Sequence, residues 1–375
     1  MIHGWDDVKD RYKNGKLLVG NTLSCYLNEP LDYDHPKNIV LDEIDNNHVI
    51  AQLLNHPIFE EFPRKVHKEQ LKTTKKFLRM FFHDTPLEEI FHSLLTTTSM
   101  VQNLHKQSQN LEKVNVQECN SFLTSQFDIL KRLYALAVLK IHPNFHAVEA
   151  NYPYYLSFLK HFRYIFSLSY DLSLQWSIMK DVEWFQDGFG KQSKTSKKVF
   201  FSTENLRKRD TNTYVFYNHG NFTMIKDEYQ NVTKIASKGD SLLHRVCEYI
   251  LTNRFPMIVT KGRKNYKEIA VRSEKVYLNK IYEEFLPESL DTKKGYSNSL
   301  VIYGQVDQSD EYLLNKVLED ASLESIAISV DNEDIETAQK TQQQIQTILK
   351  HPKHKGREIH FDFFESFTIE KPIED

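Results

Sequence analysis

The C-terminal part of the chain alternates apolar runs with amphipathic segments, and this alternation constrains the fold more than any other feature. Apolar runs at residues 299–304, 325–330 and 358–364 are expected to be strands, separated by helices at 311–318 and 335–350. Continuous apolar strands joined by helices are typical of a parallel sheet that is covered on both faces. The sequence therefore predicts an α/β fold with a Rossmann-like, doubly wound, mostly parallel sheet.

Earlier apolar runs extend this pattern toward the N-terminus. Further strands are expected at residues 16–19, 164–171, 199–202, 213–217 and 256–260. Ligands of open α/β sheets bind at the carboxyl ends of the strands. We therefore expect one pocket to be formed by residues at these strand ends, namely Gly20, Ser169, His219, Gly262 and Gly304.

The region between the first two predicted strands has a different pattern. Apolar residues recur there at helical spacing, as they do across residues 122–141, and no convincing strand interrupts them. We interpret residues 40–150 as a helical insertion or cap. Residues 1–39 and 151–375 would then form the α/β domain, and a chain of 375 residues is long enough for both.

Charge and cysteine content narrow the classes of function. The net charge of −3 argues against extended binding of nucleic acid. The longest basic stretch, residues 191–198, is interpreted as a solvated loop, with a flap beside an anionic ligand as the alternative. The three cysteines, Cys25, Cys119 and Cys247, are far apart and form no C-x-x-C pair, so we expect neither a structural zinc site nor disulfides.

Targeting and membrane segments are not expected either. The N-terminus has no basic start followed by an apolar core, and no apolar run approaches the roughly 20 residues that span a bilayer. A cytoplasmic protein with no membrane partner is the interpretation that fits the reduced cysteines best.

Three groups of residues could carry chemistry. The first is the turn after residues 17–19, where Gly20, Asn21 and Ser24 could offer backbone and hydroxyl donors to a phosphate. This turn lacks the complete G-x-G-x-x-G spacing.

The second group lies at the ends of two later strands. His219 ends an apolar run, where a histidine could act as a general base near neutral pH; the alternative is a turn histidine satisfied by backbone groups. Ser169 could face a ligand hydroxyl, and Asp171 is expected to cap the helix that follows it.

The third group follows residues 299–303. Gly304 would permit close approach of a ribose or phosphate, with Gln305 beside it. For Asp310 we favour a role as the cap of the helix that begins near residue 311.

In this order, these segments resemble the sirtuin-like superfamily, and in particular bacterial sirtuin-like proteins that hydrolyse NAD, many of them in anti-phage defence. The matching features are the turn at 20–24, the segment 166–172, His219 with Gly220, and the strand 300–304 with Asp310. The resemblance spans nearly the whole chain. It implies a sirtuin-like fold and an NAD glycohydrolase that cleaves the bond between nicotinamide and ribose.

The resemblance also implies roles for individual residues. His219 would be the general base, and Ser169 would hold a ribose hydroxyl or the attacking water. Gly20, Asn21 and Ser24 would hold the diphosphate. The nucleotide site would be completed by Asp171, Gly304 and Gln305. NAD would be the substrate or ligand, no metal would be needed, and a protein activator or a homo-oligomer could regulate the activity.

The chain departs from the family pattern at positions that matter for turnover. An asparagine usually stands where this chain has Ser169, and a serine or threonine usually stands where it has Gln305. These departures lead to a second hypothesis, a catalytically weak or inactive sensor that binds NAD or ADP-ribose. A pocket for another nucleotide is a third. Deacetylation is not expected, because three scattered cysteines cannot build the four-cysteine zinc ribbon of the sirtuins that deacetylate lysine.

Overall fold

The computed structural model describes two long parts of the chain and several shorter ones. The described residues are 2–20, single residues and short runs between 76 and 149, 152–191, 199–206, 213–227, 231–235, 240–259, 266–304, 306, 308–331, 334–354 and 356–366. Most of the predicted insertion at 40–150 lies outside them, as does most of the basic stretch 191–198. Within the insertion, residues 121–126 and α8 (Phe145–Val148) are helical.

The predicted parallel sheet is confirmed. Among the described residues it has eight strands in the order β1-β13-β12-β11-β2-β3-β7-β4, and every neighbouring pair is parallel. The strands are β1 (Ile2–His3), β2 (Lys16–Val19), β3 (Tyr164–Ser167), β4 (Phe185–Gln186), β7 (Thr213–Tyr217), β11 (Ser299–Tyr303), β12 (Ser325–Val330) and β13 (His360–Glu365).

The strand order reverses between β2 and β11. The chain runs outward from β2 through β3 to β7, and then returns to the other side of β2 to run outward through β11, β12 and β13. This is the order of a doubly wound Rossmann fold, in which the crevice at the reversal is where ligands bind. The fold is therefore α/β and Rossmann-like.

The inner strands form because they are mostly apolar and are buried along their whole length. Every residue of β2, β3, β7, β11 and β12 is buried. The runs are rich in aromatic and β-branched residues, which pack well on a pleated surface. Continuous burial requires cover on both faces of the sheet.

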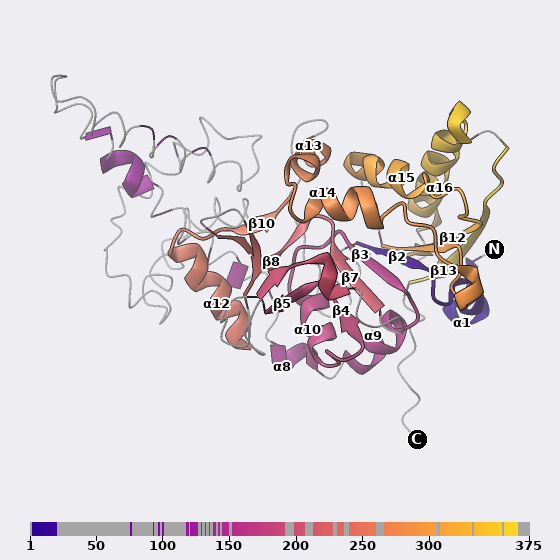
Figure 1. Ribbon diagram of the computed structural model, residues 1–375, viewed down its shortest axis with the longest axis horizontal. Coiled ribbons are helices and arrows are strands. Elements are labelled where there is room, and N and C mark those ends of the chain that lie inside the picture. Colours follow the sequence, from indigo (N-terminus) through magenta and orange to yellow (C-terminus); the bar gives the residue numbers. More distant parts are fainter. Residues whose placement is uncertain are drawn as a thin grey trace.

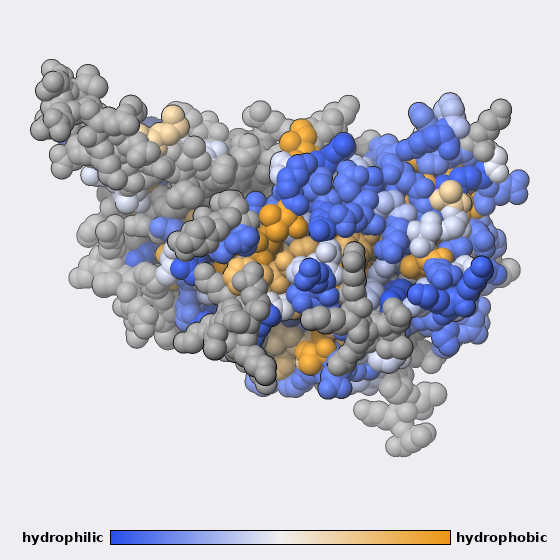
Figure 2. Space-filling model, in the orientation of Figure 1, coloured by the Kyte–Doolittle hydropathy of each residue, from blue (hydrophilic) through white to orange (hydrophobic). Residues whose placement is uncertain are grey.

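Helices supply this cover on both sides (Figure 1). One side carries α8, α9 (Tyr152–Leu159) and α10 (Ser173–Met179). The other side carries α13 (Tyr266–Ser273), α14 (Leu278–Lys280), α15 (Glu311–Val317) and α16 (Ile335–Leu349), and the π-helical segment η4 (Ile281–Phe285) continues α14. Figure 2 shows a mainly hydrophilic surface over α14, α15 and α16, because the apolar sides of these helices face the sheet.

A second sheet was not predicted. It has five strands in the order β10-β8-β9-β6-β5, and its pairings are antiparallel. They are β5 (Phe189–Lys191), β6 (Val199–Phe201), β8 (Gly220–Lys226), β9 (Val232–Lys234) and β10 (Pro256–Ile258), with α11 (Thr203–Leu206) after β6 and α12 (Asp240–Leu251) before β10.

This second sheet corrects one expectation about the site. The run at 256–260 was expected to end at the common pocket as one of the predicted strands, but β10 pairs with β8 in the second sheet. The end of this run still lies beside His219, because the Val259 N–H donates to the His219 carbonyl at 2.7 Å. Gly262, which follows the run, lies outside the described residues. The two sheets meet at Gly220, where φ is +77° and an added Cβ would lie 1.8 Å from the Met257 carbonyl oxygen. The glycine is therefore required for β8 to approach β10.

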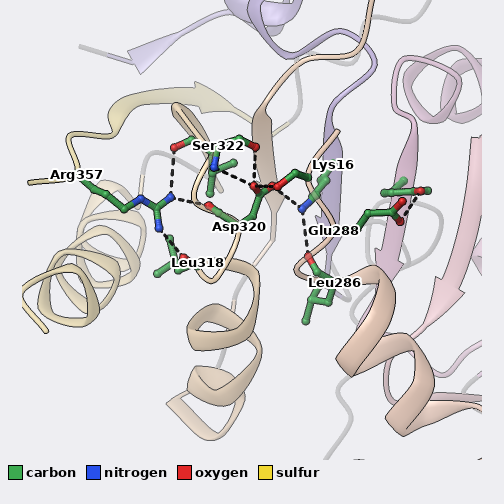
Figure 3. A network of polar contacts seen from close by, with 10 residues as sticks. Lys16, Leu286, Glu288, Leu318, Asp320, Ser322 and Arg357 are labelled. Carbon is green, nitrogen blue, oxygen red and sulfur yellow. Dashed lines mark hydrogen bonds and ion pairs between the residues drawn. The ribbon is translucent and has the colours of Figure 1, made fainter. Parts of the chain in front are cut away.

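A buried ion pair connects the amino-terminal end of β2 to the segments that follow η4 and α15 (Figure 3). Lys16 Nζ lies 3.0 Å from Asp320 Oδ2 and donates to the Leu286 carbonyl at 3.1 Å, and both charged side chains are 1% exposed. Asp320 also accepts from the hydroxyls of Ser289 and Ser322, each at 2.6 Å. Burial opposes ionisation of Asp320, but Lys16 and these hydroxyls outweigh it and hold its pKa below the usual value.

His142 connects the described end of the insertion to α10. Its Nδ1 lies 3.0 Å from the Val138 carbonyl, so Nδ1 carries the proton, and its Nε2 accepts from the Leu172 N–H at 3.3 Å. The ring therefore serves as a neutral donor and acceptor. Burial lowers its pKa, and the nearby Asp171 only partly opposes this effect.

This geometry predicts a loss of stability in mild acid. The pKa of His142 is 6.5 in the unfolded chain and lower in the folded protein. The neutral ring therefore contributes its full stabilisation at a pH above 6.5, and this contribution is lost as the pH falls toward the pKa of the folded state. Between about pH 7.5 and about pH 5.5, the free energy of unfolding in urea should fall less for His142→Gln than for the wild type, because the glutamine amide does not titrate. An equal loss in the wild type and the variant would contradict this assignment.

Within the described residues, no helix is both long and apolar enough to cross a membrane.

Candidate functional site

Two glycines lie side by side where the strand order reverses. Val19 pairs with Tyr303 in register, so Gly20 and Gly304 follow neighbouring strand ends. Gly20 N–H donates to the Tyr303 carbonyl at 2.9 Å, and Gly304 N–H donates to Ser329 Oγ at 2.7 Å. Gly304 has φ +92°, a conformation that favours glycine. A ligand could therefore approach the backbone closely at the reversal.

His219 lies at the same edge of the sheet, just after β7. Its ring is 4% exposed, and both nitrogens face protein groups. Nδ1 lies 3.0 Å from the Leu168 carbonyl, which can only accept, so Nδ1 is protonated. Nε2 lies 3.2 Å from the Tyr312 hydroxyl and 3.2 Å from Asp310 Oδ1. In this arrangement neither nitrogen is open to a water or a ligand hydroxyl.

Asp310 is the centre of a buried charged group. Lys267 Nζ donates to both of its carboxylate oxygens, at 2.8 and 3.0 Å, while His219 lies on the other side. Burial alone would raise the pKa of Asp310, but His219 and Lys267 outweigh it and lower the pKa to about 2. The carboxylate is therefore ionised throughout the physiological range and can stabilise a positive charge on His219.

The expected role of Asp310 as a helix cap is wrong. Asp310 does precede α15, but its side chain accepts no hydrogen bond from the first turn of that helix. Both oxygens are instead directed to Lys267 and His219. A buried lysine and histidine compete more strongly for a carboxylate than backbone N–H groups do.

Ser169 and Asp171 form a separate contact beside His219. The Ser169 hydroxyl donates to Asp171 Oδ2. Asp171 Oδ1 accepts from the N–H of Ser173 at 2.6 Å, so its predicted contact with the start of α10 is confirmed. Asn221 Nδ2 donates to the Asp171 carbonyl at 2.6 Å. The two predicted catalytic residues are thus neighbours through Leu168, but the Ser169 hydroxyl faces Asp171 and not the imidazole.

The contact between His219 and Asp310 reaches across the sheet. His219 follows β7 and Asp310 follows β11, and the strands β3 and β2 lie between these two. Strands are about 4.8 Å apart, so the two strand ends are about 14 Å apart. The start of α15 therefore extends over the carboxyl ends of β2 and β3, the part of the crevice that a ligand at the reversal would occupy.

One buried acceptor at this edge has no partner among the described residues. Asn218, which lies between β7 and His219, is 2% exposed, and its Oδ1 accepts no hydrogen bond. A buried acceptor without a partner is costly, and a bound hydroxyl or amide group would satisfy it.

Several predicted residues cannot be placed. Asn21, Ser24 and Gln305 lie outside the described residues. Two residues of the observed cluster were missed, Lys267 and Tyr312. Lys267 could have been noticed, because it lies four residues before the buried Val271 in α13, at a spacing where an apolar residue is expected. Tyr312 gives no comparable signal in the sequence.

Comparison with known families identifies the chain at the level of a family. Residues 71–370 match the family described as Domain of unknown function (DUF4917). The chain belongs to the DUF4917 family. The matched DUF4917 region includes His219, Ser169, Lys267 and Asp310, and it begins after β2 and Gly20. A search among curated proteins gave no match.

Proposed function

We propose that this chain binds an NAD-type dinucleotide at the carboxyl ends of β2, β3 and β11 and hydrolyses its nicotinamide–ribose bond. The observation that carries the proposal is the reversal of strand order between β2 and β11, with Gly20 and Gly304 side by side at that point. Dinucleotides bind across this crevice in folds with the same order. Glycines there allow the backbone N–H groups to approach a diphosphate.

Polar groups around the crevice suit the rest of such a ligand. The unsatisfied Asn218 Oδ1 could accept from a ribose hydroxyl, and Ser169 lies on the neighbouring strand end. In the reaction, the bond from the ribose carbon to the nicotinamide nitrogen breaks, and a water oxygen bonds to that carbon. Nicotinamide leaves as a neutral molecule because its ring nitrogen is cationic in NAD. The proton lost by the water would go to His219.

In the proposed enzyme, the observed arrangement of His219 would be a resting state. Proton transfer requires a free Nε2, whereas here Nε2 faces Tyr312 and Asp310. Movement of the start of α15 would release Nε2 and open the crevice together, because Asp310 and Tyr312 both lie there. We therefore expect slow turnover by the isolated protein and faster turnover when an activator moves this segment.

The contacts of His219 Nε2 with Tyr312 and Asp310 also favour a second function, a sensor that binds NAD or ADP-ribose without turnover. In a sensor His219 would remain bonded to its protein partners. The serine at position 169, in place of the asparagine of sirtuin-like proteins, agrees with this alternative.

Calorimetry and a product assay together test both functions. We expect NAD and ADP-ribose to bind with dissociation constants of about 1 µM to 1 mM, and the hydrolase to release nicotinamide. Ser169→Asn is expected to increase release, and Ser241→Asn, the same change at an exposed serine of α12, is expected to leave it unchanged. Binding without release in the wild type and in Ser169→Asn would favour the sensor. If neither nucleotide binds to folded protein, both proposals are wrong.

A further inference from the structure

A pocket of about 460 Å³ opens at the opposite edge of the parallel sheet. Its lining includes Tyr164, the first residue of β3, and Tyr214, near the start of β7. His219 and Gly304 follow the other ends of the strands, so this pocket is separate from the candidate site. Its volume is within the range of sites for small molecules.

The floor of the pocket is aromatic. Tyr164 pairs with Tyr214 in register, which places both rings on one face of the sheet with their centres 5.6 Å apart. Leu206, Phe285 and Leu290 add apolar surface around them. This surface suits a ligand with an aromatic or aliphatic body.

Carboxylates predominate among the charged groups that line the pocket. Glu284, Glu288 and Asp291 are opposed by Arg163 and Lys294. The Arg163 guanidinium is stacked between two rings, with its central carbon 4.4 Å from the centre of Tyr214 and 4.9 Å from that of Tyr296. The residue is 8% exposed, so a ligand in the pocket has little direct access to the guanidinium. Among the exposed charged side chains of the lining, the three carboxylates outnumber the single lysine.

Glu288, one of these carboxylates, is held in place by a contact with the sheet. The Tyr164 hydroxyl donates to Glu288 Oε2 at 2.7 Å, and burial together with Glu288 raises the pKa of Tyr164, so the hydroxyl remains a donor. The adjacent Ser289 donates to Asp320, the partner of Lys16 in Figure 3. A carboxylate that is already positioned binds a ligand at a smaller entropic cost.

From this pocket we infer a second ligand site, which takes a small organic cation: an ammonium or guanidinium head on an aromatic or aliphatic body. The head lies against Glu284 and Glu288, and the body covers Tyr164, Tyr214 and Phe285. The inference does not depend on the proposed function, because the two sites are at opposite ends of β3 and β7.

Calorimetry with three probes of similar shape tests the sign of the charge. We expect 2-phenylethylammonium to bind with a dissociation constant of about 1 mM. The neutral 2-phenylethanol should bind at least about fivefold more weakly, and the anionic 3-phenylpropionate more weakly still. Added salt should weaken binding of the ammonium probe, because the carboxylates are near the surface.

A double variant tests the residues. Glu284→Gln/Glu288→Gln preserves side-chain volume and an acceptor for Tyr164, and it should weaken binding of 2-phenylethylammonium by about fivefold or more. Glu336→Gln, at an exposed position of α16, and His219→Ala should leave the affinity unchanged. The inference is wrong if the ammonium probe does not bind, if the alcohol or the carboxylate binds equally well, or if the folded double variant retains wild-type affinity.

Discussion

Nicotinamide release from NAD is expected to fall by about 100- to 10,000-fold when His219 is replaced by alanine. His219 lies at the carboxyl edge of the sheet, and in the proposed reaction its Nε2, once released from Tyr312 and Asp310, accepts the proton lost by the attacking water. Removing a general base lowers kcat, and NAD should still bind. Steady-state assays of nicotinamide release, with calorimetry of NAD binding, measure the two effects separately.

Two further variants distinguish catalysis from folding. His354→Ala removes another buried histidine, which lies before β13 at the opposite edge, and it should leave the rate per folded molecule unchanged. Tyr312→Phe removes the hydroxyl that lies 3.2 Å from Nε2 and should increase turnover, because Nε2 then leaves its resting position more easily. Unchanged release by folded His219→Ala would show that His219 is not the base.

The free energy of unfolding is expected to fall by about 3–5 kcal/mol when Asp320 is replaced by alanine. The change removes the carboxylate that pairs with the Lys16 ammonium in Figure 3 and leaves the Leu286 carbonyl as an acceptor. The Lys16 side chain is only 1% exposed. Burial already lowers the pKa of Lys16, and Asp320 is the group that opposes this effect most. Without Asp320, the lysine must either remain charged in an apolar site or lose its proton on folding.

Urea unfolding of matched variants measures this effect. Glu336→Ala breaks a salt bridge with Lys340 on the exposed side of α16, where solvent screens both charges, and should change stability little. Lys16→Met in the Asp320→Ala background should restore part of the lost stability, because it removes the unpaired charge. A loss no greater than that of Glu336→Ala would contradict the importance of the buried pair.

The sequence predicted the parallel strands well because their signal is local. β2, β3, β7, β11 and β12 are each short, mostly apolar runs that are buried on both faces, and they follow one another with helices between them. β13 is only partly buried, but it follows the same alternation of strands and helices. Two strands of the second sheet, β6 and β10, coincide with the predicted runs at 199–202 and 256–260, but the sequence did not indicate that they belong to a separate antiparallel sheet. β8 follows the turn at His219 directly, mixes polar and apolar residues, and is a strand because β9 and β10 pair with it.

The candidate site shows the same division. The sequence by itself determined that Gly20, Ser169, His219 and Gly304 lie at strand ends, because apolar runs and the residues that terminate them are contiguous in the chain. The tertiary structure alone decided that Lys267 and Tyr312 join His219 and that Asp310 binds side chains and not its own helix. Those contacts depend on how α13 and α15 pack over the sheet, and packing between distant segments leaves no periodic trace in the sequence.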